Sequence, residues 1–113
     1  MRAVMLCSVG DIRAVLAARR VMHGRSLSLH GRARSDSGPG RATVVAGRRV
    51  GKAVDRNRAK RRLRSVLRGD RPPSGVDLVL VARPPAVAVP YASLVDEYRR
   101  LSQRLLGQLE RAA

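Results

Sequence analysis

Apolar residues recur along this chain with two different periods, and these periods predict an alternation of helices and strands. Ile12, Val15 and Leu16 recur at helical spacing, whereas Leu27 and Leu29 alternate with polar residues as in a half-buried strand. The predicted elements, in order, are a helix over residues 9–19, strands over residues 26–32 and 41–48, a helix of about four turns that ends before Gly69, a strand over residues 76–82 and a helix over residues 91–111.

Two of these elements predict where the core lies. Residues 76–82 (VDLVLVA) are nearly all apolar, which is typical of a central strand buried on both faces. The last helix carries an apolar stripe at four- and three-residue steps, made of Leu94, Tyr98, Leu101, Leu105 and Leu109. We therefore expect one domain over residues 1–113, with residues 1–7 frayed. Helices would cover one side of its sheet, and the other side, or a groove beside the first helix, would be open to a ligand.

The charge of the chain predicts a polyanionic partner, and its composition argues against several other functions. The 113 residues include 24 Lys or Arg and 8 Asp or Glu, so the formal net charge is +16. No apolar run approaches the ~20 residues of a membrane span, and Cys7 has no second cysteine to pair with. With two His and eight acids, a catalytic or metal site made of protein side chains is not expected. We expect a cytoplasmic location.

The most basic stretch of the chain, residues 48–68, predicts the surface that binds this partner. Ten of its residues are Lys or Arg and Asp55 is its single acid, so ion pairs within the helix cannot balance the charge. On a helical projection, one side is apolar and carries Ala59, Leu63, Val66 and Leu67. The opposite side carries Asn57, Arg58, Arg61, Arg64, Ser65 and Arg68. Because Arg outnumbers Lys and its planar guanidinium group matches phosphate, this side predicts a nucleic-acid surface.

The segment from Val50 to Arg64 (VGKAVDRNRAKRRLR) resembles the signature of the bacterial ribonuclease P protein subunit. That family's pattern is a basic pair followed by V-G-x-A-V-x-R-N-R-x-K-R-x-x-R. It is matched here without a gap by Arg48, Arg49, Val50, Gly51, Ala53, Val54, Arg56, Asn57, Arg58, Lys60, Arg61 and Arg64. The resemblance implies an α/β (α+β) sandwich of the ribosomal protein S5 domain 2-like type. Its order would be α-β-β-β-α-β-α, with a four-stranded mixed sheet and helices packed on it. The short strand that the periodicity does not predict would then lie within residues 41–52.

The resemblance also implies a function. The chain would be the RNA-binding protein subunit of an endoribonuclease that removes the 5′ leader from precursor tRNA. The RNA subunit with bound Mg²⁺ would be the catalyst, and the protein would supply no catalytic residue and bind no metal. Its partners would be the catalytic RNA and the precursor tRNA with its leader, without a membrane or an obligate protein partner. The residues implied to bind RNA are Arg48, Arg49, Lys52, Arg56, Asn57, Arg58, Lys60, Arg61 and Arg64.

The resemblance implies that the leader lies in a cleft beside the first helix and the sheet. The residues implied to line this cleft depart from the family's pattern. The family has aromatic residues on the first helix, and Ile12 and Leu16 stand in their places. His30 stands where the family often has Tyr or Phe, and it would be the remaining flat ring for stacking on a base. A second interpretation stays open, in which Ile12 and Leu16 are core residues and His30 is structural or merely exposed. Arg19 stands where the family has a turn glycine.

Two other functions fit part of the sequence. A structural RNA-binding protein of the ribosomal type would share the charge and the sandwich, but not the Arg-Asn-Arg motif of residues 56–58. A DNA-binding module would lay the basic helix in a major groove, but it would need a second element or a dimer to fix its register.

Overall fold

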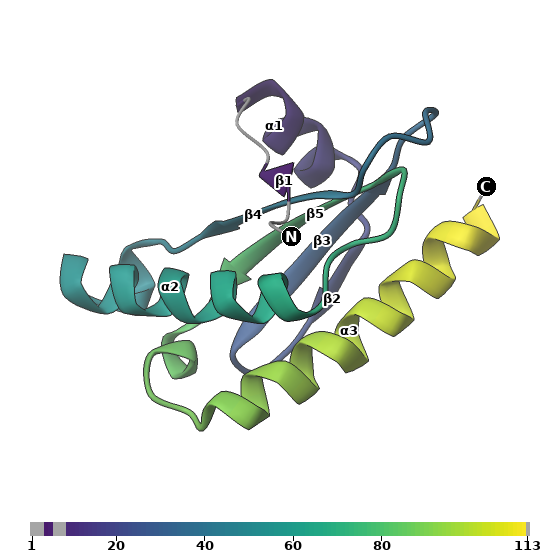
Figure 1. The fold of residues 1–113 in the computed structure, drawn as a ribbon. Coiled ribbons are helices and arrows are strands. Elements are labelled where there is room, and N and C mark those ends of the chain that lie inside the picture. The colour runs from purple at the N-terminus through teal and green to yellow at the C-terminus, as the bar shows by residue number, and fades with distance from the viewer. Residues whose placement is uncertain (1–3, 6–8, 113) are drawn as a thin grey trace.

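A single mixed β-sheet lies between helices on both of its faces (Figure 1). The computed structural model describes residues 4–5 and 9–112. Across the sheet, the strands follow the order β1 (Val4–Met5), β4 (Arg41–Val45), β5 (Val76–Ala82), β3 (Leu27–Ala33) and β2 (Val21–His23). Strand β5 is parallel to β4 and antiparallel to β3, and it is the central strand that its apolar sequence predicted.

The helices divide between the two faces of this sheet. Helix α1 (Val9–Ala17) lies on one side in Figure 1, and α2 (Ala53–Gly69) and α3 (Tyr91–Ala112) lie on the other. Successive side chains of β5 point to opposite faces, and the packing follows this alternation. Leu78 and Leu80 belong to the large core with α2 and α3, whereas Val79 packs with Val15 of α1. Two 3₁₀ turns, η1 (Arg48–Val50) and η2 (Pro84–Val87), precede α2 and α3.

The apolar stripes of α2 and α3 form this large core, as their spacing predicted. All four stripe residues of α2 and all five of α3 are buried, and the ring of Tyr98 is 1% exposed. The Tyr98 hydroxyl donates a hydrogen bond to the carbonyl oxygen of Asp70 at 3.0 Å, which ties α3 to the end of α2. Burying each large apolar side chain contributes roughly 1.5–3 kcal/mol. Within the described part of the chain, no helix is long and apolar enough to cross a membrane.

The order of elements from α1 onward is α-β-β-β-α-β-α, as the resemblance implied, with β2 to β5 as the four-stranded mixed sheet. The position predicted for the extra strand was wrong, because it is β2 and not a segment within residues 41–52, which hold β4 and η1. A strand of three residues is too short to show a period in the sequence. Its pairing with β3, in which Val21 lies opposite His30, stabilises it instead.

Three further expectations need correction. Helices cover both faces of the sheet, because α1 packs on the face that was expected to be open. The segment expected to fray contains the two-residue strand β1, which pairs in parallel with β4, whereas residues 1–3 and 6–7, with Cys7, lie outside the described residues. Helix α1 ends two residues earlier than predicted, and Arg19 follows it with a φ of 55°, in the left-handed region.

Candidate nucleic-acid interface

Helix α2 turns a cationic surface to solvent because its apolar stripe is fixed against the sheet. The residues opposite that stripe at helical spacing are Val54, Asn57, Arg61 and Arg64, all exposed, and they line a shallow hollow of about 440 Å³. We name this set the α2 surface. It presents two guanidinium groups and one amide, which are donors that bind phosphate oxygens. The single acid of the helix, Asp55, lies in the first turn and is not part of this surface.

The turn before α2 positions the start of this surface. Gly51 has a φ of 140°, a conformation that side-chain-bearing residues rarely adopt. A Cβ atom at Gly51 would also lie 2.6 Å from Oδ2 of Asp55, so the carboxylate occupies the space beside the glycine. Because Asp55 lies at the positive end of the helix dipole, its carboxylate stabilises the first turn of α2.

The nine residues predicted to bind RNA differ in exposure. Arg48, Arg49, Lys52, Asn57, Arg58, Arg61 and Arg64 are exposed, whereas Arg56 and Lys60 are half-buried. The Nε atom of Arg56 is buried and has no hydrogen-bond partner among the described residues. The structure therefore brings most of the predicted residues to solvent along η1 and the outer side of α2.

Arg62 belongs to the same basic run, but its side chain turns inward. Its guanidinium group donates a hydrogen bond to the carbonyl oxygen of Ala86 at 2.8 Å and another to that of Val89. Both acceptors lie in or just after η2, so Arg62 ties α2 to the turn that precedes α3. The sequence offered a signal for this role, because position 62 lies beside the apolar stripe, three residues after Ala59 and four before Val66.

The residues predicted to hold a leader lie on the other face of the sheet. Ile12 is half-buried and packs with Val45 and Val81 around the buried pair Val15 and Val79. Leu16 is 41% exposed, so the interpretation of Leu16 as a core residue is wrong. The pairing of the strands places two rows of residues on this face of the sheet, and we name the face the α1 face. One row is His23, Ser28, Val81 and Val45, and the other is Val21, His30, Val79 and Thr43.

His30 is half-buried on the α1 face, and Nδ1 of its ring is buried without a hydrogen-bond partner among the described residues. Burial lowers the pKa of His30 below its ordinary value of 6.5, and the nearby ring of His23 lowers it further. Nδ1 of His23 itself lies 3.1 Å from the hydroxyl oxygen of Ser28. The neutral form of His30 is therefore favoured in the folded protein.

This lowered pKa predicts a weak dependence of stability on pH. The unfolded chain binds a proton at His30 more readily than the folded chain does. The contribution of neutral His30 to the free energy of unfolding is therefore complete above about pH 6.5 and is lost as the pH falls through the lowered pKa. We expect the melting temperature to decrease over this range, and less so in His30→Gln. Thermal unfolding at a series of pH values measures the difference, and parallel curves for the two proteins would contradict it.

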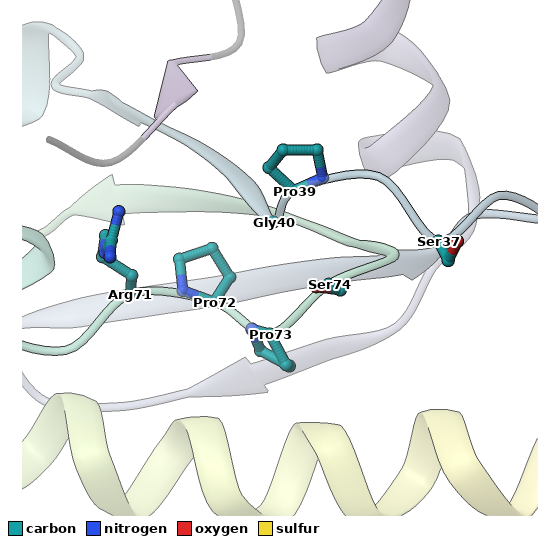
Figure 2. Close-up of a pocket in the computed structure, with 7 residues that line it drawn as sticks. All are labelled: Ser37, Pro39, Gly40, Arg71, Pro72, Pro73 and Ser74. Atoms are coloured by element: carbon teal, nitrogen blue, oxygen red, sulfur yellow. The ribbon is translucent and has the colours of Figure 1, made fainter. Parts of the chain in front are cut away.

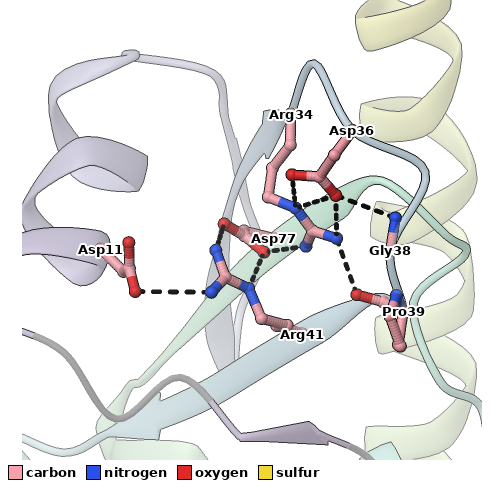
Figure 3. A network of polar contacts seen from close by, with 7 residues as sticks. All are labelled: Asp11, Arg34, Asp36, Gly38, Pro39, Arg41 and Asp77. Carbon is pink, nitrogen blue, oxygen red and sulfur yellow. Dashed lines mark hydrogen bonds and ion pairs between the residues drawn. The ribbon is translucent and has the colours of Figure 1, made fainter.

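A buried carboxylate joins α1 to β4, β5 and the loop that follows β3, and the sequence did not single it out (Figure 3). Asp77 on β5 is 0% exposed and accepts hydrogen bonds from Arg34 at 2.6 Å and from Arg41 at 2.8 and 2.9 Å. Arg41 continues to Asp11 of α1 at 3.5 Å, and Arg34 binds Asp36 at 3.0 Å. Burial alone would raise the pKa of Asp77, but the bonds from the two guanidinium groups outweigh it and hold the pKa below the ordinary value.

The hairpin that carries His30 is held from the opposite face by a second buried acid. Glu97 of α3 is 7% exposed, and its Oε2 accepts hydrogen bonds from the backbone N–H groups of Ser26 and Leu27 at 2.9 and 3.0 Å. A Cβ atom at Gly24 would lie 2.6 Å from this oxygen, so the turn needs a glycine there. The acid thus fixes the entry into β3 and the position of the α1 face.

A larger hollow of about 620 Å³ lies where the β3–β4 loop meets the α2–β5 loop (Figure 2). Its lining consists of Ser37, Pro39, Gly40, Arg71, Pro72, Pro73 and Ser74. This lining has no acid or histidine that could transfer a proton. Over the whole described part of the chain, no three His, Cys, Asp or Glu side chains come together as metal ligands would.

Comparisons with known proteins give one consistent result. The family model described as Ribonuclease P matches residues 2–106. The ribonuclease P protein component of Symbiobacterium thermophilum is 37% identical over 112 residues, which cover 97% of this chain and 96% of that protein. The component of Gluconacetobacter diazotrophicus is 36% identical over 102 residues, 88% of each chain.

Solved structures of RNase P proteins have a similar fold. The protein of Staphylococcus aureus superposes with a TM-score of 0.75 at 16% identity, covering 90% of this chain and 94% of that one. The protein of Thermotoga maritima gives a TM-score of 0.70 at 21% identity, covering 82% and 90%. The arrangement of helices and strands is thus similar even where few residues are identical.

Proposed function

This chain belongs to the ribonuclease P protein family, and we propose that it is the RNA-binding subunit of a ribonuclease P ribonucleoprotein. It would assist the catalytic RNA in removing the 5′ leader from precursor tRNA in the cytoplasm. The observation that carries this proposal is the α2 surface, where exposed Asn57, Arg61 and Arg64 belong to the family's basic motif and lie opposite a fully buried stripe. Such a surface suits the phosphates of a structured RNA.

Two faces of the molecule would serve two RNA partners. In this proposal the α2 surface binds the catalytic RNA, and the α1 face, with Ile12, Leu16 and His30, receives the leader of the precursor. The separation of these faces by the sheet supports this division, because an RNA bound along α2 leaves α1 free. The protein thereby acts by positioning, since it holds the substrate's leader relative to the RNA that cuts it.

The chemistry of cleavage would belong to the RNA subunit. We propose that this RNA binds the Mg²⁺ ions that the reaction uses. The described carboxylates of the chain offer no cluster suited to such an ion, and Asp77, the most buried of them, is engaged by two guanidinium groups. The protein would need neither a further protein partner nor a membrane for this role.

Reconstitution of the ribonucleoprotein tests this function. The purified chain alone should cleave no precursor tRNA, and added to its cognate catalytic RNA at low Mg²⁺ it should restore removal of the leader. A polycation of similar charge serves as the control for simple neutralisation of phosphates. Stimulation no greater than that of the polycation would refute the proposal. Co-sedimentation with ribosomes, together with such a result, would favour the ribosomal alternative.

A further inference from the structure

We infer that this chain holds the leader mainly by its phosphates, through a cationic corner made of Arg13 on α1 and of Arg19 and Arg20, which follow its C-terminal end. The inference rests on the proposed function and names how the leader is recognised. All three side chains are exposed, and none of them has a hydrogen bond or an ion pair with the residues that the structure describes. Exposed cations without a counter-charge attract a polyanion.

Backbone hydrogen bonds connect this corner with the residues predicted to line the leader site. The N–H group of Arg19 donates to the carbonyl oxygen of Leu16 at 3.3 Å. The carbonyl oxygen of Arg20 accepts from the N–H group of Gly31, which follows His30, at 3.0 Å. Arg13 lies three residues before Leu16 and shares its exposed side of α1. A strand of RNA lying against Leu16 and His30 would therefore have its phosphates within reach of these guanidinium groups.

The surrounding sequence leaves these charges uncompensated. Residues 12–35 contain six arginines and no Asp or Glu, and the acids on either side, Asp11 and Asp36, form ion pairs with Arg41 and Arg34. Of the six, Arg34 forms ion pairs with Asp77 and Asp36. The side chain of Arg83, from outside this segment, donates a hydrogen bond to the carbonyl oxygen of Gly24 and supplies no negative charge. The last turn of α1 carries no basic residue, so the helix dipole accounts at most for Arg19 and Arg20 just beyond its C-terminal end, and not for Arg13.

The backbone of Arg19 supports a role for its side chain. Arg19 is the residue after the helix cap and has a φ of 55°, a conformation that glycine adopts without strain. Its N–H bond to Leu16 is one that such a turn makes with glycine as well. A residue with a side chain is less stable than glycine in this conformation, so the arginine at this position motivates the proposal that its side chain binds the leader.

The α1 face has no Phe, Tyr or Trp for stacking and offers only the imidazole rings of His23 and His30, so we expect the phosphates to be the main feature of the leader that is bound. The chain has two tyrosines and no Phe or Trp. Both lie on α3, on the opposite face of the sheet: Tyr98 is buried in the large core, and the hydroxyl of Tyr91 donates to Ser65 of α2 at 2.9 Å. Of the residues predicted at the leader site, only His30 has a flat ring. Binding should therefore depend steeply on salt and weakly on the bases of the leader.

The test uses ribonucleoprotein assembled from the full chain and its catalytic RNA. Precursor tRNAs carry a long leader, a short leader, or a long leader whose nucleotides lack bases, and their dissociation constants are measured over a range of salt. Arg19→Gln with Arg20→Gln removes two charges and keeps the strained backbone, whereas Arg19→Lys with Arg20→Lys keeps the charges. Arg100→Gln with Arg104→Gln is the matched control, because both residues are exposed on α3, on the other side of the sheet.

We expect the Gln pair to weaken binding of the long leader by about tenfold at moderate salt, with a log–log salt slope shallower by about 0.7 for each phosphate that is no longer bound. The Lys pair should bind nearly as the unaltered chain does, and the short leader should be unaffected. The base-free leader should bind almost as well as the normal one. Arg19→Gly should melt at the same or a higher temperature and still bind the long leader more weakly, which a purely structural role would not produce.

Several results would overturn the inference. One is a base-free leader that binds far more weakly than the normal leader, since stacking would then dominate. Others are a Gln pair that affects short and long leaders equally, or no more than the α3 control does. An unaltered chain that fails to stimulate the catalytic RNA at all would instead refute the proposed function, so the two failures are distinguishable.

Discussion

Replacing Asp77 by Asn is expected to lower the free energy of unfolding by about 3 kcal/mol or more, and the melting temperature by roughly 10 °C. Asp77 is fully buried between the guanidinium groups of Arg34 and Arg41. The side chain of Arg34 is itself 7% exposed, so the neutral amide would leave a nearly buried cation with only the exposed carboxylate of Asp36 as its counter-charge. Thermal and urea unfolding of the isolated chain measure the loss.

Two controls separate this effect from a general change in charge. Asp36→Asn removes an acid that also binds Arg34, but the Asp36 side chain is 62% exposed and little change is expected. The second control is pH. Since the pKa of Asp77 is lowered in the fold, its contribution is present at neutral pH and is lost as the pH falls below about 3.8, through the lowered value. Asp77→Asn should lack this part of the acid-induced loss, and an unchanged melting temperature at neutral pH would contradict the argument.

The Asp77 network illustrates what the sequence could not predict. Its members are separated by 36 and 43 residues along the chain, and only the pairing of β5 with β3 and β4 brings them together. One signal was present, because an acid inside the otherwise apolar strand of residues 76–82 must find a partner when it is buried. Which of the 24 basic residues would be that partner does not follow from spacing or composition.

Local patterns, by contrast, predicted the elements that repeat for several turns or alternate over a whole strand. The stripes of α2 and α3 and the central position of β5 follow from periodicity, and the structure confirms them. The three-residue strand β2 was missed because it is too short to show a period. Its place was then wrongly assigned to residues 41–52, where η1 follows β4.

The sequence predicted the exposed side of α2 correctly but not the structural role of Arg62. The exposed side of α2 followed from the stripe opposite to it, and the structure places Asn57, Arg61 and Arg64 together there. Arg62 was counted among the cations of the run, although its hydrogen bonds to Ala86 and Val89 give it a structural role. Charge density alone therefore overstates the number of residues available to a partner, and position relative to the apolar stripe corrects it.

This distinction between outward and inward arginines leads to the second large effect. Replacing Arg61 and Arg64 by Gln is expected to weaken assembly with the catalytic RNA by an order of magnitude or more at about 0.15 M salt. Both side chains are exposed on the α2 surface, so the melting temperature should change little. The log–log slope of the association constant against salt should become shallower by about 0.9 for each phosphate that the variant no longer binds. Titration of labelled RNA at several salt concentrations gives both quantities.

Arg62→Gln is the control from the same helix, and it should behave in the opposite way. Because Arg62 donates to two backbone carbonyl groups of the turn before α3, its loss should lower the melting temperature and leave the salt slope unchanged. Arg100→Gln with Arg104→Gln removes two exposed charges from α3 and controls for net charge. If the α2 pair and the α3 pair weakened assembly equally, the RNA would be responding to the overall charge of the chain and not to the α2 surface.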